Sequence, residues 1–262
     1  MTNLEVTIAD TGGWQRVTHA EEVWGTVVTF EIRHPVIGED VQQLFVDGAA
    51  FLHEVDRWFS TYRTDSLITA LRNGMLEREQ MPAIVQAVLT NCEVVRDLTD
   101  GVFDPWSLPD GVDPSGYVKG WAADVVADLF VSRGYPNVNV NAAGDVTCRG
   151  LQAPNEPWVI GIRHPDHAFE IISTVRLFNQ ACATSGEYER GPHILDPRSG
   201  ERKVALRSAT VVGPDGGMAD ALATALLIRG RDGVAWFSDM PEWSGLLIEG
   251  ERALTFGPAF DA

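Results

Sequence analysis

The amino-acid sequence predicts an α+β fold, a single compact domain of mixed, mainly antiparallel sheets packed with helices. Amphipathic segments with an apolar residue every three or four positions are typical of helices, and short β-branched segments with alternating polarity are typical of strands. The two kinds do not alternate in the strand–helix–strand rhythm of a parallel sheet. No linker or fixed-period repeat divides the 262 residues. We therefore expect one domain over residues 1–262, with residues 1–20 poorly ordered or peripheral.

The first half of the chain contains one predicted strand and three predicted helices. Residues 24–32 alternate and are rich in β-branched side chains, so they predict a strand. A helix with one apolar stripe follows, and the stripe consists of Val41, Leu44, Phe45, Leu52, Val55 and Phe59. A second helix begins near Pro82, because proline is favoured in a first turn. The third follows a glycine-containing turn at residues 113–120 and stops at residues 134–136.

The second half is predicted to be mostly strands. Turn residues separate short apolar segments at residues 138–140, 146–149, 158–163, 169–177 and 209–212. A glycine-rich loop leads from these strands into a helix at residues 218–229, and two more alternating segments follow around residues 246–248 and 253–256. Segments so short and closely spaced indicate antiparallel hairpins.

Charge and cysteine content exclude several classes of protein. The net charge is −17, from 20 basic and 37 acidic residues, and no basic run is present. Nucleic-acid binding normally needs a basic face, so we exclude it. A small anion can still bind where local donors or a metal ion override the global charge. Cys92, Cys148 and Cys182 are far apart and lack CxxC spacing, which predicts buried free thiols rather than disulfides or a zinc site.

The N-terminal segment is not expected to be a signal peptide. It has neither a basic start with a long apolar stretch nor a lipid-attachment cysteine. No apolar run approaches the roughly 20 residues that span a bilayer. We expect a soluble, cytoplasmic protein with no membrane span.

Two short segments have the residue types of an ion-binding site. Asp220 and Thr224 are four residues apart in a predicted helix and therefore share one face, where a carboxylate and a hydroxyl suit Mg²⁺. Lys119 lies between Gly116 and Gly120 at a predicted helix start, where a phosphate or pyrophosphate would offset its unfavourable interaction with the helix dipole. The alternative for Asp220 and Thr224 is a helix-start charge beside a packed threonine. The alternative for Lys119 is an exposed lysine.

Two further segments contain a candidate base and a candidate ring-binding residue. His193 precedes an Asp-Pro turn that can hold its imidazole in one tautomer, so it can act as a base or be a hydrogen-bonded turn residue. Tyr62 lies among small hydroxyl side chains in residues 60–66, which can line a ring-binding cleft or simply end a helix.

Taken together and in order, these segments resemble the ApbE family, the FAD:protein FMN transferases. The resemblance runs from residue 24 to about residue 230. The matching segments are residues 24–26, 60–66, 101–105, 113–124, 141–145, 183–188, 193–200 and 219–224. Their combination is far more specific than any one of them.

The resemblance implies a role for each matching residue. Asp220 and Thr224 match side-chain Mg²⁺ ligands, and Gly116 matches a carbonyl ligand. His193 matches the catalytic histidine, with Lys119 taking part of the pyrophosphate charge. Tyr62 matches an aromatic residue that stacks on or closes over the flavin, and Thr184 and Ser185 match a small-hydroxyl loop. The positions around FAD are matched by Trp24, Val102, Phe103, Asp104, Asp113, Lys119 and Ile194.

The activity implied is Mg²⁺-dependent cleavage of FAD, with FMN joined to a Ser or Thr of an acceptor flavoprotein and AMP released. One alternative is an FAD pyrophosphatase, in which water replaces the acceptor. Tyr62 favours transfer, because a bulky ring can exclude water. Another is a flavin carrier without chemistry, which would need neither His193 nor the pair of Asp220 and Thr224.

The chain departs from the family pattern at several positions. Trp24 replaces the usual Met, Ala143 replaces the first glycine of a Gly-Gly-Asp motif, and Arg72 stands at the usual Asn. The segments 104–113 and 189–193 are shorter than usual. We expect these differences to change the acceptor cleft more than the metal site.

Overall fold

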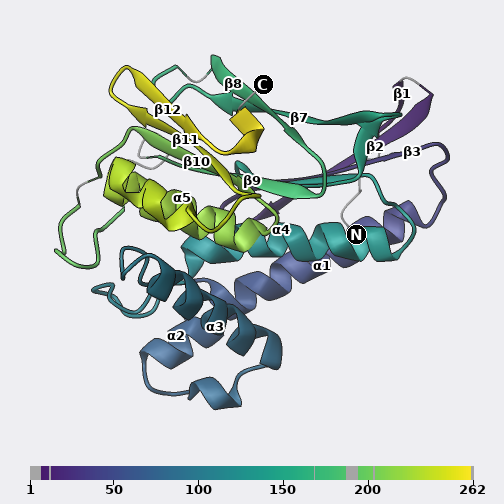
Figure 1. The fold of residues 1–262 in the computed structure, drawn as a ribbon. Coiled ribbons are helices and arrows are strands. Elements are labelled where there is room, and N and C mark those ends of the chain that lie inside the picture. The colour runs from purple at the N-terminus through teal and green to yellow at the C-terminus, as the bar shows by residue number, and fades with distance from the viewer. Residues whose placement is uncertain (1–6, 12, 168, 187–193, 203, 261–262) are drawn as a thin grey trace.

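Helices cover one face of a nine-stranded open sheet in the computed structural model of the chain (Figure 1). The model describes residues 7–11, 13–167, 169–186, 194–202 and 204–260. All neighbouring strands of this sheet are antiparallel. In spatial order they are β1 (Thr7–Thr11), β2 (Trp14–Val23), β3 (Thr26–His34), β4 (Val138–Ala142), β5 (Asp145–Arg149), β9 (Gln180–Gly186), β10 (Ser208–Gly213), β11 (Ser244–Glu249) and β12 (Arg252–Phe256).

The helices and a second, smaller sheet complete the fold. The small sheet consists of β6 (Leu151–Ala153), β7 (Glu156–Arg163) and β8 (Ile171–Leu177). The α-helices are α1 (Val41–Phe59), α2 (Leu67–Arg72), α3 (Ala83–Leu98), α4 (Ser115–Ser132) and α5 (Gly216–Arg229). Short 3₁₀ helices span Arg78–Gln80, Gly230–Phe237 and Pro258–Phe260. The predicted α+β class is therefore confirmed.

Two apolar cores hold these layers together. The main core lies between the large sheet and the helices and includes Phe30, Phe45, Phe130 and Leu226, all fully buried. The second core packs the β7–β8 hairpin on the large sheet and contains Trp158. Helix α5 is buried on nearly all sides because it lies between the sheet and the other helices, whereas α1 buries the predicted stripe and Gly48.

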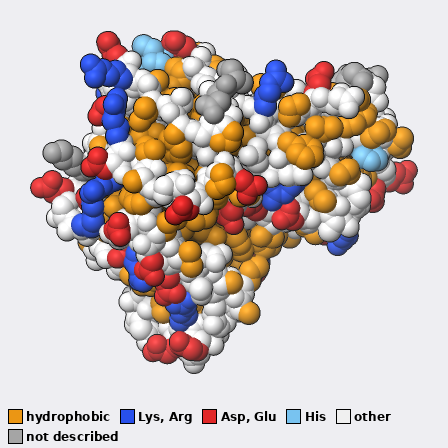
Figure 2. Space-filling view, viewed as in Figure 1, with side chains coloured by type: hydrophobic (Ala, Val, Ile, Leu, Met, Phe, Trp, Pro, Cys, Tyr) orange, Lys and Arg blue, Asp and Glu red, His pale blue; other side chains and the backbone are white. Residues whose placement is uncertain are grey.

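The three cysteines are buried, and charged side chains of both signs mix on the face shown in Figure 2. Cys92, Cys148 and Cys182 are free and buried, as predicted. On the face shown in Figure 2, Lys and Arg side chains lie among Asp and Glu side chains instead of forming one basic patch. Within the described ranges, no helix has both the length and the apolar character needed to cross a membrane.

Residues 14–20, part of the segment expected to be poorly ordered or peripheral, belong to β2, the second strand from one edge of the sheet. This strand pairs with β3 from Gln15↔His34 to Val23↔Thr26, and Val17 is fully buried. The inward positions of β2 include the polar His19, so the apolar alternation that identifies a strand is weak there. Pairing with a long neighbouring strand, rather than local pattern, determines its structure.

Two other boundaries differ from expectation. Helix α4 begins at Ser115 rather than after residue 120, because an Asp113 carboxylate oxygen accepts the Ser115 N–H at 3.0 Å. Lys119 therefore lies in the second turn. Thr184 and Ser185, expected in a loop, lie in β9 and pair with Thr210 and Ala209 of β10.

Candidate functional site

One cleft, with a volume of ≈ 760 Å³, brings together every predicted site residue that the structure describes. It lies where the β2–β3 turn, the end of α1, the start of α4, β9 and α5 meet. The predicted residues that line it are Trp24, Tyr62, Val102, Phe103, Asp104, Asp113, Gly116, Lys119, Thr184, Ser185, Ile194, Asp220 and Thr224. His193 lies outside the described residues, directly before Ile194.

The floor of the cleft contains a buried cluster of three charges. The Lys119 ammonium contacts Asp145 Oδ2 and donates to Asp220 Oδ2 at 2.9 Å. The two carboxylate side chains are 4% exposed and the lysine side chain 27%. Burial opposes the charge of Lys119, but the two carboxylates outweigh burial and raise the pKa of Lys119. Lys119 therefore stays an ammonium ion.

Oxygen atoms suited to a hard cation lie beside this cluster. Thr224 Oγ1 is 3.0 Å from Ser185 Oγ, and a Cβ added to Gly116 would lie 3.6 Å from Thr224 Oγ1. Asp220 is one helical turn before Thr224. A carboxylate, a hydroxyl and the Gly116 carbonyl are the ligand types that Mg²⁺ prefers, so these residues fit such an ion. Burial is the main cause that raises the pKa of Asp220, and the nearby Asp145 carboxylate is the second. A bound cation would offset this rise, because it favours the charged carboxylate.

The same donors define which kinds of metal this site suits. Among the described residues, no group of three or more His, Cys, Asp or Glu is arranged to hold a metal ion. The candidate cation site would instead combine the Asp220 carboxylate with the neutral oxygens of Thr224 and Gly116. That composition favours Mg²⁺ over softer ions such as Zn²⁺.

Helices α4 and α5 meet in very close contact beside the cluster. A Cβ on Gly120 would overlap the Gly216 carbonyl. The Gly216 N–H donates to Asp124 Oδ2 at 2.6 Å, and the Thr147 hydroxyl donates to Asp124 Oδ1 at 2.7 Å. Asp124 thus joins α4, β5 and α5, and its burial raises its pKa to about 6. This contact sets the distance between Lys119 on α4 and Asp220 on α5.

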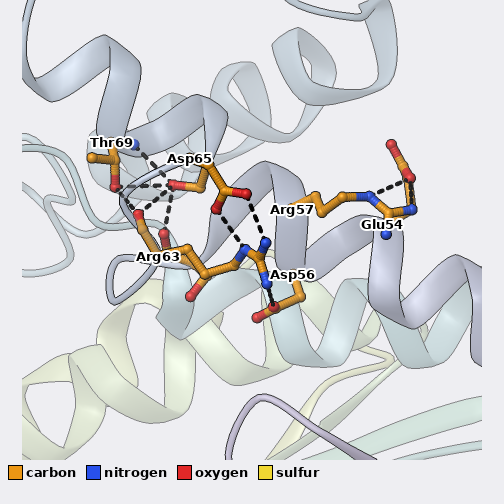
Figure 3. A network of polar contacts seen from close by, with 8 residues as sticks. Glu54, Asp56, Arg57, Arg63, Asp65 and Thr69 are labelled. Atoms are coloured by element: carbon orange, nitrogen blue, oxygen red, sulfur yellow. Dashed lines mark hydrogen bonds and ion pairs between the residues drawn. The ribbon is translucent and has the colours of Figure 1, made fainter.

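Tyr62 lines the cleft, and the residues that follow it form a dense polar network with the end of α1 (Figure 3). Arg63 pairs with Asp65 at 2.8 Å and with Asp56 at 3.4 Å. Ser66 donates to the Ser60 carbonyl at 2.7 Å and accepts the Thr69 N–H at 3.1 Å, which caps α2. The Tyr62 side chain is 93% exposed. The loop is therefore fixed, while the ring projects into solvent beside the entrance.

The β2–β3 turn places Trp24 in the cleft wall with an unusual backbone. Its φ is 58°, and that of Gly25 is 70°, a combination typical of a two-residue hairpin turn. A left-handed conformation is uncommon for a bulky residue. The Trp24 indole N–H is buried without a hydrogen-bond partner among the described residues.

Arg72 supports the short segment between Asp104 and Asp113. Its Nε donates to the Val112 carbonyl at 2.7 Å, and its guanidinium lies 3.8 Å from Asp113 Oδ2. The side chain of Asp104 accepts the Trp106 N–H at 3.0 Å. The short loop is therefore closed by these contacts, and both aspartates face the cleft.

Asp145 was not among the predicted site residues, although it lines the cleft and contacts Lys119. The sequence feature that could have identified Asp145 is its position after Ala143-Gly144, within the matching segment 141–145. An acidic residue after a turn is common on protein surfaces. Its burial beside a lysine 26 residues earlier depends on tertiary packing.

Comparison with known proteins supports the resemblance. The model of the ApbE family matches residues 108–246. The FAD:protein FMN transferase of Vibrio cholerae is 36% identical over 132 residues, 46% of this chain and 39% of that protein. The FAD:protein FMN transferase of Salmonella typhimurium is 32% identical over 158 residues, 53% of this chain and 45% of that protein. The alignments thus span less than half the length of these relatives.

Solved structures share the fold across nearly the whole chain. The flavin transferase ApbE from Vibrio cholerae superposes with a TM-score of 0.82 at 23% identity, covering 94% of this chain and 98% of that chain. The ApbE protein from Thermotoga maritima gives a TM-score of 0.80 at 22% identity, covering 92% and 96%. At this identity the likeness concerns the fold.

Proposed function

Because the chain belongs to the ApbE family, whose model matches more than half of it, we propose that it is a Mg²⁺-dependent FAD:protein FMN transferase. It would cleave the pyrophosphate of FAD, join FMN to a Ser or Thr hydroxyl of an acceptor flavoprotein, and release AMP. One observation carries this proposal most strongly. A single cleft combines cation-type oxygen donors, a charged lysine and apolar walls, as a dinucleotide with a pyrophosphate requires.

Each group of residues would have a defined task. Asp220, Thr224 and the Gly116 carbonyl would hold the cation, which would neutralise pyrophosphate charge when bound. The Lys119 ammonium would lie against a phosphate oxygen and stabilise negative charge in the transition state. Val102, Phe103 and Trp24 provide apolar surface for the rings.

The proposed reaction is a displacement at phosphorus. The acceptor hydroxyl oxygen forms a bond to the FMN-side phosphorus, and the bond from that phosphorus to the bridging oxygen breaks. AMP leaves with the bridging oxygen and the electron pair of the broken bond. The hydroxyl proton would pass to His193, whose role as base rests on the family pattern and on its place in the sequence directly before Ile194, which lines the cleft.

Hydrolysis of FAD to FMN and AMP is the second candidate function. The Tyr62 ring is exposed, so it can exclude water only where it packs against the flavin ring. Without that packing, water could take the place of the acceptor hydroxyl at the same phosphorus. The two functions share every residue of the cleft floor and differ only in what reaches it.

Product analysis tests the proposal. The protein would be incubated with FAD, Mg²⁺ and a Ser/Thr acceptor peptide, and the products separated by mass spectrometry. A peptide carrying FMN, with AMP in equal amount, supports transfer, whereas free FMN with AMP alone supports hydrolysis. His193→Ala should lower turnover by about 10²–10⁴-fold. If no AMP forms with any acceptor, the chain does not catalyse this chemistry.

A further inference from the structure

The charge cluster at the cleft floor contains one carboxylate that the proposed reaction does not use, that of Asp145. It lies beside Lys119, and its side chain is 4% exposed. Within the described part of the chain, Lys119 is its only side-chain hydrogen-bond partner. A buried carboxylate is costly unless it is paired, so Asp145 and Lys119 need one another.

The Asp145 carboxylate is attached to a rigid backbone, whereas the Lys119 ammonium lies at the end of a flexible side chain. Asp145 is the first residue of β5 and follows a tight turn, in which Ala143 has φ 57° and Gly144 φ 104°. The Gly144 N–H donates to Asn141 Oδ1 at 2.8 Å, which closes this turn. Lysine carries its charge on a flexible four-carbon chain. The position of the ammonium therefore depends on where the rigid strand places the carboxylate.

Asp220 has two competing partners in this cluster. Its Oδ2 accepts from the Lys119 ammonium at 2.9 Å, and it is also the carboxylate of the proposed cation site. With Asp145 present, the ammonium has a second carboxylate, and the cluster of two anions and one cation keeps one net negative charge. Without Asp145, the ammonium and Asp220 would form a neutral, closed pair.

We propose that Asp145 is a positioning residue that shares the Lys119 ammonium at the cleft floor and thereby leaves negative charge on the cluster for Asp220 to bind the divalent cation. This inference rests on the proposed function, because it assumes a cation at Asp220. Asp145 acts through Lys119 and touches neither the cation nor the reacting phosphorus.

Metal titration without FAD tests the inference, with a readout independent of turnover. Mg²⁺ would be titrated by calorimetry into the metal-free full-length wild type, Asp145→Asn, Lys119→Met and the double variant. Asp145→Asn should weaken Mg²⁺ binding by about tenfold or more, since 1.4 kcal/mol corresponds to a factor of ten. In the Lys119→Met background, where no ammonium competes, the same substitution should change the affinity by less than about threefold.

The double variant separates this role from a simple charge effect. If loss of one negative charge alone weakens binding, Asp145→Asn will have the same effect in both backgrounds, and the inference is overturned. It is overturned also if Asp145→Asn binds Mg²⁺ like the wild type. Asp128→Asn is the matched control, because it removes the same charge from an exposed α4 side chain that pairs with Arg149. It should leave the affinity unchanged.

Two further results keep the test decisive. Asp145→Glu retains the carboxylate, and its affinity for Mg²⁺ should lie within about threefold of the wild-type affinity. If the Asp145→Asn protein does not fold, Asp145→Glu takes its place in the test. In that case, an Asp145→Glu affinity that falls equally with and without Lys119 overturns the inference. Failure of the wild type to bind Mg²⁺ would overturn the proposed cation site together with this inference. Wild-type binding of Mg²⁺, together with an effect of Asp145→Asn that is the same with and without Lys119, would overturn the role of Asp145 alone.

Discussion

Tyr62 combines a fixed backbone with a free ring. The ion pairs of Arg63 and the hydrogen bonds of Ser66 hold the loop, yet the ring is 93% exposed at the entrance of the cleft. An exposed aromatic ring of this kind gains buried area only when something lies against it. A bound flavin ring is the natural partner under the proposed function.

Substitution of Tyr62 should therefore affect both affinity and product choice. Tyr62→Ala should weaken FAD binding by up to about tenfold, because ring stacking contributes about 0.5–1.5 kcal/mol. It should also raise free FMN relative to FMN-peptide, since water can then reach the phosphorus. Calorimetry and mass spectrometry measure the two effects, with Tyr62→Phe as the control that keeps the ring. An unchanged product ratio in Tyr62→Ala would show that Tyr62 does not exclude water.

Among the elements, α4 and α5 determine the geometry of the cleft floor. Gly116 and Lys119 lie on α4, while Asp220 and Thr224 lie on α5. The helices approach closely because neither Gly120 nor Gly216 has a side chain. Any side chain at the crossing must move the two halves of the proposed cation site apart.

Gly120→Ala should consequently damage both stability and Mg²⁺ binding. Overpacking costs typically 1–3 kcal/mol, and we expect a loss of about 3 kcal/mol because the neighbouring atoms are backbone. Urea denaturation and metal titration measure the two effects. Gly161→Ala is the control, since the atoms nearest to an added Cβ there would be side-chain atoms of the exposed Ile171 at 3.0–3.4 Å, not backbone. Equal behaviour of the two variants would show that the crossing tolerates a methyl group.

Asp124, which joins the same helices to β5, should make stability depend on pH. Its folded-state pKa of about 6 is above the ordinary value of 3.8, so the folded protein binds this proton more tightly than the unfolded chain does. The resulting contribution to stability is complete below about pH 4 and is lost as the pH rises through about 6.

The matched variant is Asp124→Asn, whose amide does not titrate. The free energy of unfolding of the wild type, minus that of the variant, should fall by up to about 3 kcal/mol between pH 4 and pH 7, because each pKa unit corresponds to 1.36 kcal/mol. Urea denaturation at several pH values measures this difference. A constant difference would mean that the carboxyl group titrates normally in the folded protein.

At the scale of the whole molecule, the cleft joins segments from most of the chain. Its lining includes Trp24 from the β2–β3 turn, Tyr62 after α1 and Ser185 from β9, besides residues of α4 and α5. A ligand that contacts all of them should stabilise the entire fold, because binding to the folded state adds to the free energy of unfolding.

Thermal unfolding should show this stabilisation and its dependence on metal. FAD with Mg²⁺ at about 100 times its dissociation constant should add about 2.7 kcal/mol, which corresponds to a rise on the order of 5–10 °C in Tm for a chain of this size. EDTA should remove most of the rise, while riboflavin, which lacks the pyrophosphate, should give a shift independent of Mg²⁺. An FAD shift of the same size in EDTA would contradict the proposed cation site.

Local sequence pattern was sufficient for much of the helical structure and for part of the site. The apolar stripe of α1 predicts its buried face, because side chains three and four residues apart share one side of a helix. Asp220 and Thr224, which are four residues apart, share one side of α5 for the same reason. The order of the matching segments further indicated the family and the residues that line one cleft.

Tertiary structure decided the features that depend on contact between distant segments. β2 forms because β3 pairs with it, although its own alternation is weak, and Thr184 and Ser185 are extended because β10 lies beside them. Asp145 joins Lys119 only because β5 and α4 pack together. Periodicity along a chain reports which way neighbouring side chains point, whereas pairing between segments far apart in the chain depends on how the whole chain packs.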